Sequence, residues 1–107
     1  MKLKLNGKHK KSMTIVLCSK GYPGSYKKNA ILPDLKRTKL QKNFFIFHAG
    51  TKILNNNIVA NGGRVLNITG LGNKFKHIRT ELIRILKNIN WKNGFYRGDI
   101  GWRVINK

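Results

Sequence analysis

The strongest periodic pattern in the sequence lies between residues 75 and 89. Apolar residues recur there at every third or fourth position, while charged and polar residues occupy most of the other positions. The apolar positions are Phe75, Ile78, Leu82, Ile85, Leu86 and Ile89. This spacing predicts an amphipathic helix whose apolar stripe packs against a core. We expect Asn73 to be its N-cap, and His77 to pair weakly with Glu81 one turn away.

Short runs of β-forming residues precede the helix. Residues 13–19, 44–48 and 64–69 are predicted strands, and 53–54 with 58–59 form a predicted hairpin around three asparagines, which tolerate left-handed backbone. We expect a loop at 8–12 and an irregular stretch over 25–42 with a helical turn after Pro33. The second strand is expected to end at 49–51, and a turn is expected at 70–73. The tail, 91–104, is expected to form loops with one short strand. Several strands with one helix favour the α+β class.

The charge balance leaves two interpretations open. The 107 residues carry a net charge of +20, from 23 Lys and Arg against 3 acids, Asp34, Glu81 and Asp99. A partner rich in phosphate would suit such a chain, but the heavy use of Lys, Asn and Ile is also typical of an AT-rich genome. So few carboxylates argue against a magnesium–nucleotide site built from acidic ligands.

Other composition features restrict the function classes. A single cysteine, Cys18, excludes an internal disulfide and any cysteine-based metal site, and fits a reducing, cytoplasmic setting. The sequence has no apolar run of membrane-spanning length and no signal-peptide core, so we expect no membrane partner. Of the three histidines, only His48 follows a predicted strand beside a glycine turn. We find no catalytic set and no metal-ligating set.

Three glycine-rich segments adjoin predicted strands: 21–24, 49–51 and 61–64. Glycine in such places lets backbone amides approach an anion, or serves tight turns and bulges at the edge of a sheet. None of the segments matches a P-loop or a dinucleotide-binding fingerprint. In the tail, Asp99 stands between two arginines, and we interpret it as a structural ion-pair residue.

These segments together resemble one enzyme family. Ser19–Tyr26 contains its Gly-Tyr-Pro-Gly stretch, Phe47–Thr51 its Phe-His-Ala-Gly-Thr motif, Asn61–Leu66 its Gly-Gly-Arg-Val-Leu motif, and Tyr96–Arg103 is similar to its C-terminal signature. The four blocks occur in the family's order across nearly the whole chain. The sequence therefore resembles the C-terminal domain of glycinamide ribonucleotide synthetase, the phosphoribosylamine–glycine ligase family.

The resemblance implies a fold and a function. The expected fold is a small α+β domain with a mostly antiparallel sheet and one packed helix, as in ATP-grasp ligases. The family joins glycine to phosphoribosylamine in purine biosynthesis, using ATP to activate the glycine carboxylate as an acyl phosphate. Its ATP and Mg sites lie in central ATP-grasp domains that this sequence lacks. We therefore expect this chain to bind no cofactor itself, to be inactive alone, and to complete the phosphoribosylamine and glycine site with those domains as partners.

The resemblance also implies which residues face the substrates. The expected substrate-binding residues are Tyr22, Pro23, Gly24, His48, Gly50, Thr51, Gly62, Gly63 and Arg64. Among them, Arg64 is expected to grip a phosphate or carboxylate, because a guanidinium can bind either bidentately. We divide the chain into a basic segment, 1–12, and a domain, 13–107. The alternative, a small nucleic-acid-binding protein, is less favoured because the lysines are scattered and the aromatics mostly fall inside apolar strands.

Overall fold

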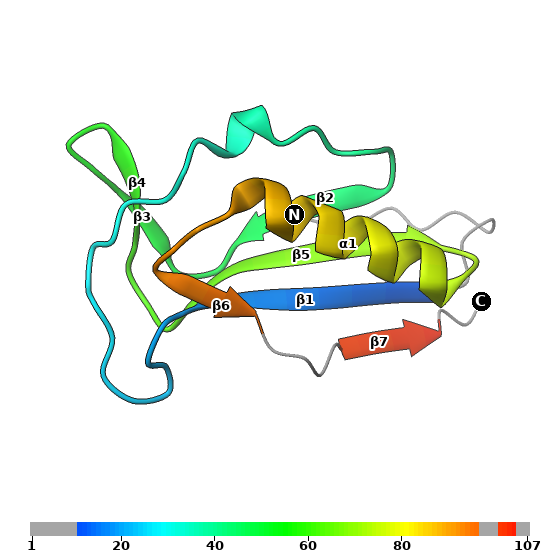
Figure 1. Cartoon of the computed structure of the whole chain (residues 1–107), viewed down its shortest axis with the longest axis horizontal. Helices are drawn as coiled ribbons and strands as arrows, with labels where there is room; N and C mark the ends of the chain where they lie inside the picture. Colours follow the sequence, from blue (N-terminus) through cyan, green and yellow to red (C-terminus); the bar gives the residue numbers. More distant parts are fainter. Residues whose placement is uncertain (1–10, 97–100, 105–107) are drawn as a thin grey trace.

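Five strands pair into one antiparallel sheet, and two more form a separate two-stranded hairpin (Figure 1). The computed structural model describes residues 11–96, and the backbone of 101–104. The strands are β1 (Lys11–Ser19), β2 (Phe44–His48), β5 (Arg64–Gly72), β6 (Gly94–Tyr96) and β7 (Gly101–Val104). Their order is β2-β5-β1-β6, with β7 pairing along the other half of β1, and every pairing is antiparallel. The expected α+β class and antiparallel sheet are confirmed.

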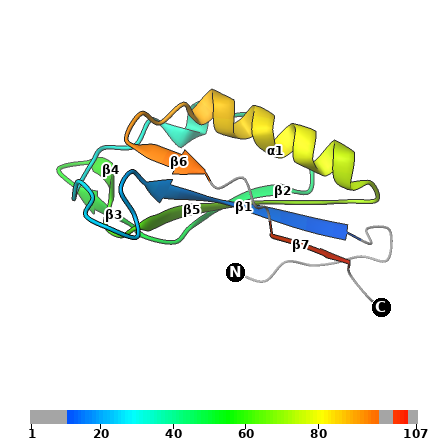
Figure 2. The same ribbon diagram turned by 60° about the horizontal axis from the view of Figure 1, so that its bottom comes forward.

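Helix α1 (Phe75–Ile89) covers one face of this sheet (Figure 2). Its predicted stripe is buried, apart from Phe75, which is partly buried. Facing it, alternate residues of the two central strands are buried: Met13, Ile15 and Leu17 from β1, and Leu66 and Ile68 from β5. Burying each large side chain of this kind stabilises the fold by about 1.5–3 kcal/mol. The core therefore lies between the helix and the sheet.

The prediction for the N-terminal end of the helix is wrong, and the C-terminal end follows a common capping rule. The predicted N-cap, Asn73, is wrong, because Lys74 holds the extended N-cap conformation, with φ −130°, and makes no side-chain capping bond. At the other end Asn90 adopts the left-handed conformation, with φ 45°, and its N–H donates to Leu86 O. That geometry is a common helix stop, and asparagine tolerates it better than most residues.

The two central strands are longer than predicted. Lys11 and Ser12, expected in a loop, begin β1, while the expected turn at 70–73 is wrong because Gly70 to Gly72 continue β5. A Cβ on Gly70 would lie 2.4 Å from the ring of Phe44 and 2.9 Å from Ile78. Gly70 therefore serves close packing between β2, β5 and α1 rather than a change of chain direction.

The connections follow local rules more closely. The predicted helical turn after Pro33 is the 3₁₀ helix η1 (Leu35–Arg37), where Asp34 accepts a hydrogen bond from the N–H of Lys36 at 3.0 Å. The predicted hairpin is confirmed as β3 (Thr51–Leu54) and β4 (Asn57–Ala60), so Thr51 opens a strand instead of ending one. Asn55 and Asn56 have φ of 52° and 67°, as a tight hairpin turn requires. The tail contributes two short strands, where one was expected.

Glu81 has a different partner from the one predicted. It is buried in the α1 stripe, where Arg84 donates two hydrogen bonds to it: Nε to Oε1 at 2.8 Å and Nη2 to Oε2 at 2.5 Å. These bonds hold the pKa of Glu81 below its ordinary value against the opposing effect of burial, and His77 adds only the last of the electrostatic contributions. The expected roles of residues 1–10 and of Asp99 lie outside the described residues.

Candidate functional site: three glycine loops at one end of the sheet

The three glycine-rich segments meet at one end of the sheet. β1 ends at Ser19 and β2 ends at His48, while β5, antiparallel to both, begins between them at Arg64. The turn after β1, the link from β2 to β3, and the link from β4 to β5 are therefore neighbours (Figure 1). Segments that are up to about forty residues apart in sequence thus form one surface because of strand order.

Backbone hydrogen bonds tie the three loops together. The N–H of Ser19 donates to Gly63 O at 2.7 Å, and its hydroxyl Oγ donates to Gly62 O at 3.1 Å. The N–H of Asn61 donates to Gly50 O at 2.7 Å. The loops after β1 and β2 are thus each fixed to the loop before β5, which makes this surface a preformed scaffold.

The glycines permit contacts that a side chain would block. A Cβ on Gly63 would lie 1.7 Å from Cδ1 of Tyr22, so the Tyr22 ring rests directly on the backbone of Gly63. A Cβ on Gly50 would lie 2.2 Å from the carbonyl oxygen of Arg64. Gly21 has φ +96°, a conformation that L side chains rarely adopt. These close approaches explain why glycine stands at each position.

Tyr22 connects the loops to a second aromatic side chain. Its ring meets the ring of Tyr26 edge-on, with centroids 6.3 Å apart, and the Tyr22–Pro23 peptide is cis. Pro23 and Gly24 are exposed at the tip of this turn. Their position near the other loops follows from the path of the turn. In the second loop, His48 Nδ1 and Thr51 Oγ1 share a hydrogen bond of 2.9 Å across the glycine link.

Arg64 is the one cationic side chain among the predicted site residues. It is exposed at the start of β5, opposite Cys18, where the pairing with β1 shifts register. Within residues 11–96 its side chain has no hydrogen-bond or ion-pair partner. An exposed guanidinium can bind a phosphate or a carboxylate through two parallel hydrogen bonds.

The structure brings together the three loops that carry the predicted site residues, and some of these residues contact one another across the loops. Tyr22 packs on Gly63, Gly50 lies against the backbone of Arg64, and Gly62 accepts the bond from Ser19. No role had been predicted for Ser19, although it is buried and holds the Gly62–Gly63 loop by two bonds. A hydroxyl residue at the end of a strand, directly before a glycine turn, was the available signal for it.

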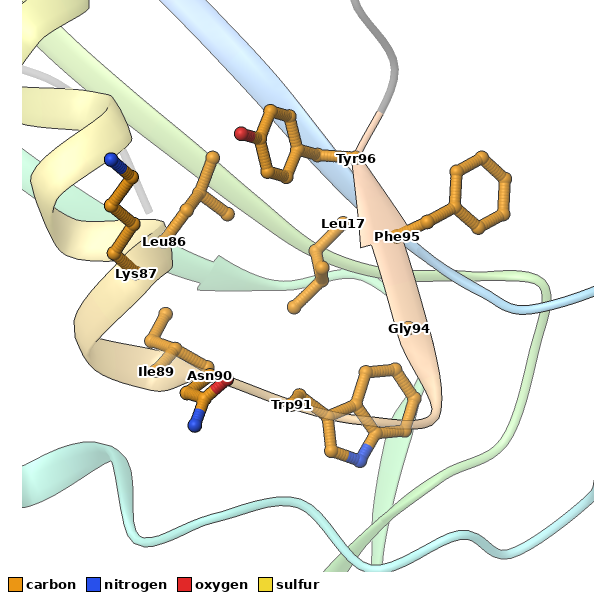
Figure 3. Close-up of a pocket in the computed structure, with 9 residues that line it drawn as sticks. All are labelled: Leu17, Leu86, Lys87, Ile89, Asn90, Trp91, Gly94, Phe95 and Tyr96. Atoms are coloured by element: carbon orange, nitrogen blue, oxygen red, sulfur yellow. The ribbon is translucent and has the colours of Figure 1, made fainter.

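A separate hollow of about 310 Å³ lies between the end of α1 and β6 (Figure 3). Its lining is mostly apolar, and the indole N–H of Trp91 donates to Ile31 O at 3.0 Å beside it. None of the nine predicted residues lines this hollow. In the part of the chain that the structure describes, no three His, Cys, Asp or Glu residues are grouped to hold a metal ion, and no helix is long and apolar enough to cross a membrane.

The comparison with known families decides the assignment. The model of the phosphoribosylglycinamide synthetase C domain matches residues 12–103, a span that includes all three loops. The chain belongs to this family. Its four sequence blocks therefore mark a phosphoribosylglycinamide synthetase C domain, as the resemblance implied, and the three-loop surface is a feature of that domain in this chain.

Individual relatives agree with the family. The chain is 39% identical over 103 residues to the phosphoribosylamine–glycine ligase of Brucella melitensis, covering 96% of this chain and 24% of that protein. It is 40% identical over 98 residues to the chloroplastic ligase of Arabidopsis thaliana, covering 90% and 18%. The crystal structure of the ligase from Thermotoga maritima superposes with a TM-score of 0.65 at 27% identity, covering 80% of this chain and 20% of that one. The chain thus spans a quarter or less of these relatives.

Proposed function

We propose that this chain is the C-terminal domain of a phosphoribosylamine–glycine ligase and closes the substrate side of that enzyme's active site in purine biosynthesis. The supporting observation is the three-loop surface: Tyr22 on Gly63, Gly50 against Arg64, and Ser19 bonded to the Gly62–Gly63 backbone. The family assignment and the names of the relatives give the reaction, in which glycine is joined to 5-phosphoribosylamine.

The role of the chain's own residues in that reaction is to position a substrate. The Arg64 guanidinium binds the phosphate of phosphoribosylamine or the carboxylate of glycine through two parallel hydrogen bonds. Tyr22, Pro23, Gly24, His48, Gly50, Thr51, Gly62 and Gly63 shape the wall around it. Holding a reactant in a fixed geometry lowers the entropic part of the barrier without any chemical step by this chain.

The ATP and Mg sites belong to the rest of the enzyme in this proposal. The two carboxylates among the described residues do not fit a magnesium site: Asp34 accepts a bond at η1, and Glu81 is buried against Arg84. The ATP-grasp domains, in the same chain or a separate one, are the partners that supply these sites. We place the assembly in the cytoplasm, and the division between residues 1–12 and 13–107 stays a prediction.

Reconstitution tests the proposal. The chain is joined to, or mixed with, the remaining three quarters of the Brucella melitensis ligase, and glycine-dependent ADP formation is measured with phosphoribosylamine present. We expect activity from the combination and none from either part. Sequencing the DNA and transcript upstream of the Met1 codon supplies the natural partner: an adjoining or separately expressed ATP-grasp frame supports the proposal.

Arg64→Ala in the active combination tests the site itself. Loss of a bidentate charged contact worth about 1.5–3 kcal/mol should raise the KM for one substrate by about ten- to a hundredfold, with a smaller effect on kcat. Arg79→Ala, which removes an exposed arginine from α1, is the matched control and should leave both constants unchanged. Unchanged KM and kcat in Arg64→Ala would remove Arg64 from the site.

A further inference from the structure

One flank of α1 lies beside the connection formed by residues 31–43. Trp91 donates to Ile31 O at 3.0 Å just beyond the end of the helix, and Arg84 Nη2 donates to Lys39 O at 2.9 Å in its last turns. At the start of the helix, a hollow of about 340 Å³ is lined from both segments. The connection therefore runs antiparallel along the helix, as the view in Figure 1 shows.

Exposed cations gather on these two segments. We call them the basic face: Lys36, Arg37, Lys39, Lys42, Lys74, Lys76 and Lys87, all of them exposed. Lys42 and Lys74 line the same hollow although they come from different segments. These two lysines, which are distant in sequence, thus become neighbours because the connection lies along the helix.

Almost no negative charge balances this face. The described carboxylates are Asp34 and Glu81, and the ion pair that Glu81 makes with Arg84 uses both of its oxygens. Asp34, beside the face, accepts a bond from the backbone of Lys36 and lies within ion-pair distance of no described cation. No cation of the basic face therefore has a carboxylate partner among the described residues, and clustered cations without such partners attract anionic ligands.

We infer that the basic face binds the phosphate backbone of a nucleic-acid duplex. Lys76 and Lys87 stand about 16 Å apart along the helix axis at 1.5 Å per residue, while a duplex carries one charge per about 1.7 Å, so a single duplex can engage cations along the whole face. No Phe, Tyr or Trp side chain is exposed on the described face, so it lacks the large aromatic platforms on which single strands stack. Binding is therefore by backbone charge, without base preference.

This function is independent of the proposed ligase role. The basic face uses none of the nine residues predicted to bind the ligase substrates. Its cations also have no part in the packing of α1, which depends on the opposite, apolar stripe. Neutralising them thus tests the surface without touching the three loops.

The test measures binding of the full chain to labelled DNA and RNA duplexes of about 20 base pairs, from about 50 to about 200 mM salt. The face variant carries Lys39→Gln, Lys42→Gln, Lys76→Gln and Lys87→Gln. The control variant carries four exposed changes elsewhere, Lys20→Gln, Lys27→Gln, Lys28→Gln and Lys52→Gln, so both lose the same charge. Circular dichroism confirms folding. If the face variant does not fold, Lys36→Gln with Arg37→Gln replaces it, against Lys27→Gln with Lys52→Gln.

The expected result separates the two variants. The four-residue face variant should lose at least about tenfold in affinity at about 0.1 M salt, and its salt slope should fall by about 3 to 4, since each phosphate contact contributes about 0.9. The control should stay within about threefold of the unchanged chain. Equal losses in both variants, or no binding by the unchanged chain at the lowest salt, would overturn the inference. Tighter binding of an acidic polypeptide of equal charge would also overturn it, in favour of an acidic protein surface.

Discussion

Gly63→Ala tests the packing that unites the glycine loops. The new methyl group would lie 1.7 Å from Cδ1 and 2.1 Å from Cε1 of Tyr22, where carbon atoms normally keep about 3.5–4.0 Å. The ring has to move by about 2 Å, and because Tyr22 is only half-buried it can swing towards solvent. The substitution therefore detaches the loop after β1 from the loop before β5.

The expected cost follows from the area that the ring gives up. A displaced tyrosine losing about 100 Å² of apolar contact at about 25 cal/mol per Å² costs about 2.5 kcal/mol. Replacing glycine with alanine also restricts the unfolded chain, and this offsets the loss of stability by about 0.4–1 kcal/mol. We expect the free energy of unfolding to fall by about 1.5–2 kcal/mol, measured by urea unfolding followed by circular dichroism.

Two controls make the result specific. A Cβ on Gly62 would meet its nearest atoms at 3.7 and 3.8 Å, which is ordinary contact, so Gly62→Ala should be neutral or slightly stabilising. In a Tyr22→Ala background the clash is absent, so Gly63→Ala should then stabilise the fold by about 0.4–1 kcal/mol, which comes from restricting the unfolded chain, giving a coupling energy of about 2.5 kcal/mol. Equal effects of Gly62→Ala and Gly63→Ala, or an undiminished cost without Tyr22, would refute the packing argument.

Two further predictions concern Ser19 and Glu81. Ser19→Ala removes the hydroxyl bond to Gly62 O, and it should lower the free energy of unfolding by about 1 kcal/mol in urea titrations; no change would show that the backbone bond from Ser19 suffices. Because the pKa of Glu81 is lowered in the fold, the stabilisation by its carboxylate is present above the ordinary glutamate pKa of 4.5 and is lost as pH falls through the lowered value. Stability measured from pH 7 downwards should therefore fall below about pH 4.5 more steeply than in Glu81→Gln, and parallel curves would contradict the assignment.

The sequence predicted most elements because their signals are local. The helix over Phe75–Ile89 follows from the spacing of its apolar residues, and the hairpin follows from asparagines that accept positive φ. The errors came where packing between distant segments decides the outcome. Gly70 looked like a turn residue, yet it is glycine because Phe44 and Ile78 occupy the space of its side chain.

The candidate site also combines features that the sequence predicts with features that depend on the tertiary structure. The four family blocks identified the loops, and Arg64 among them, from sequence alone. The contact of Tyr22 with Gly63 and the bonds from Ser19 depend on β5 lying between β1 and β2, and strand order was beyond the sequence analysis. Glu81 pairs with Arg84 and not with His77. Both residues lie one turn from Glu81 on the same helix, so side-chain geometry decides between them.

The sequence by itself determined the class of fold, the approximate positions of most strands and the family, because periodicity, turn residues and motif order are written along the chain. Only the tertiary structure decided that three separate glycine segments form one surface, and that the connection over 31–43 lies along α1. Both depend on which distant segments become neighbours, and that is set by the burial of one shared core between the sheet and the helix, not by any local stretch of residues.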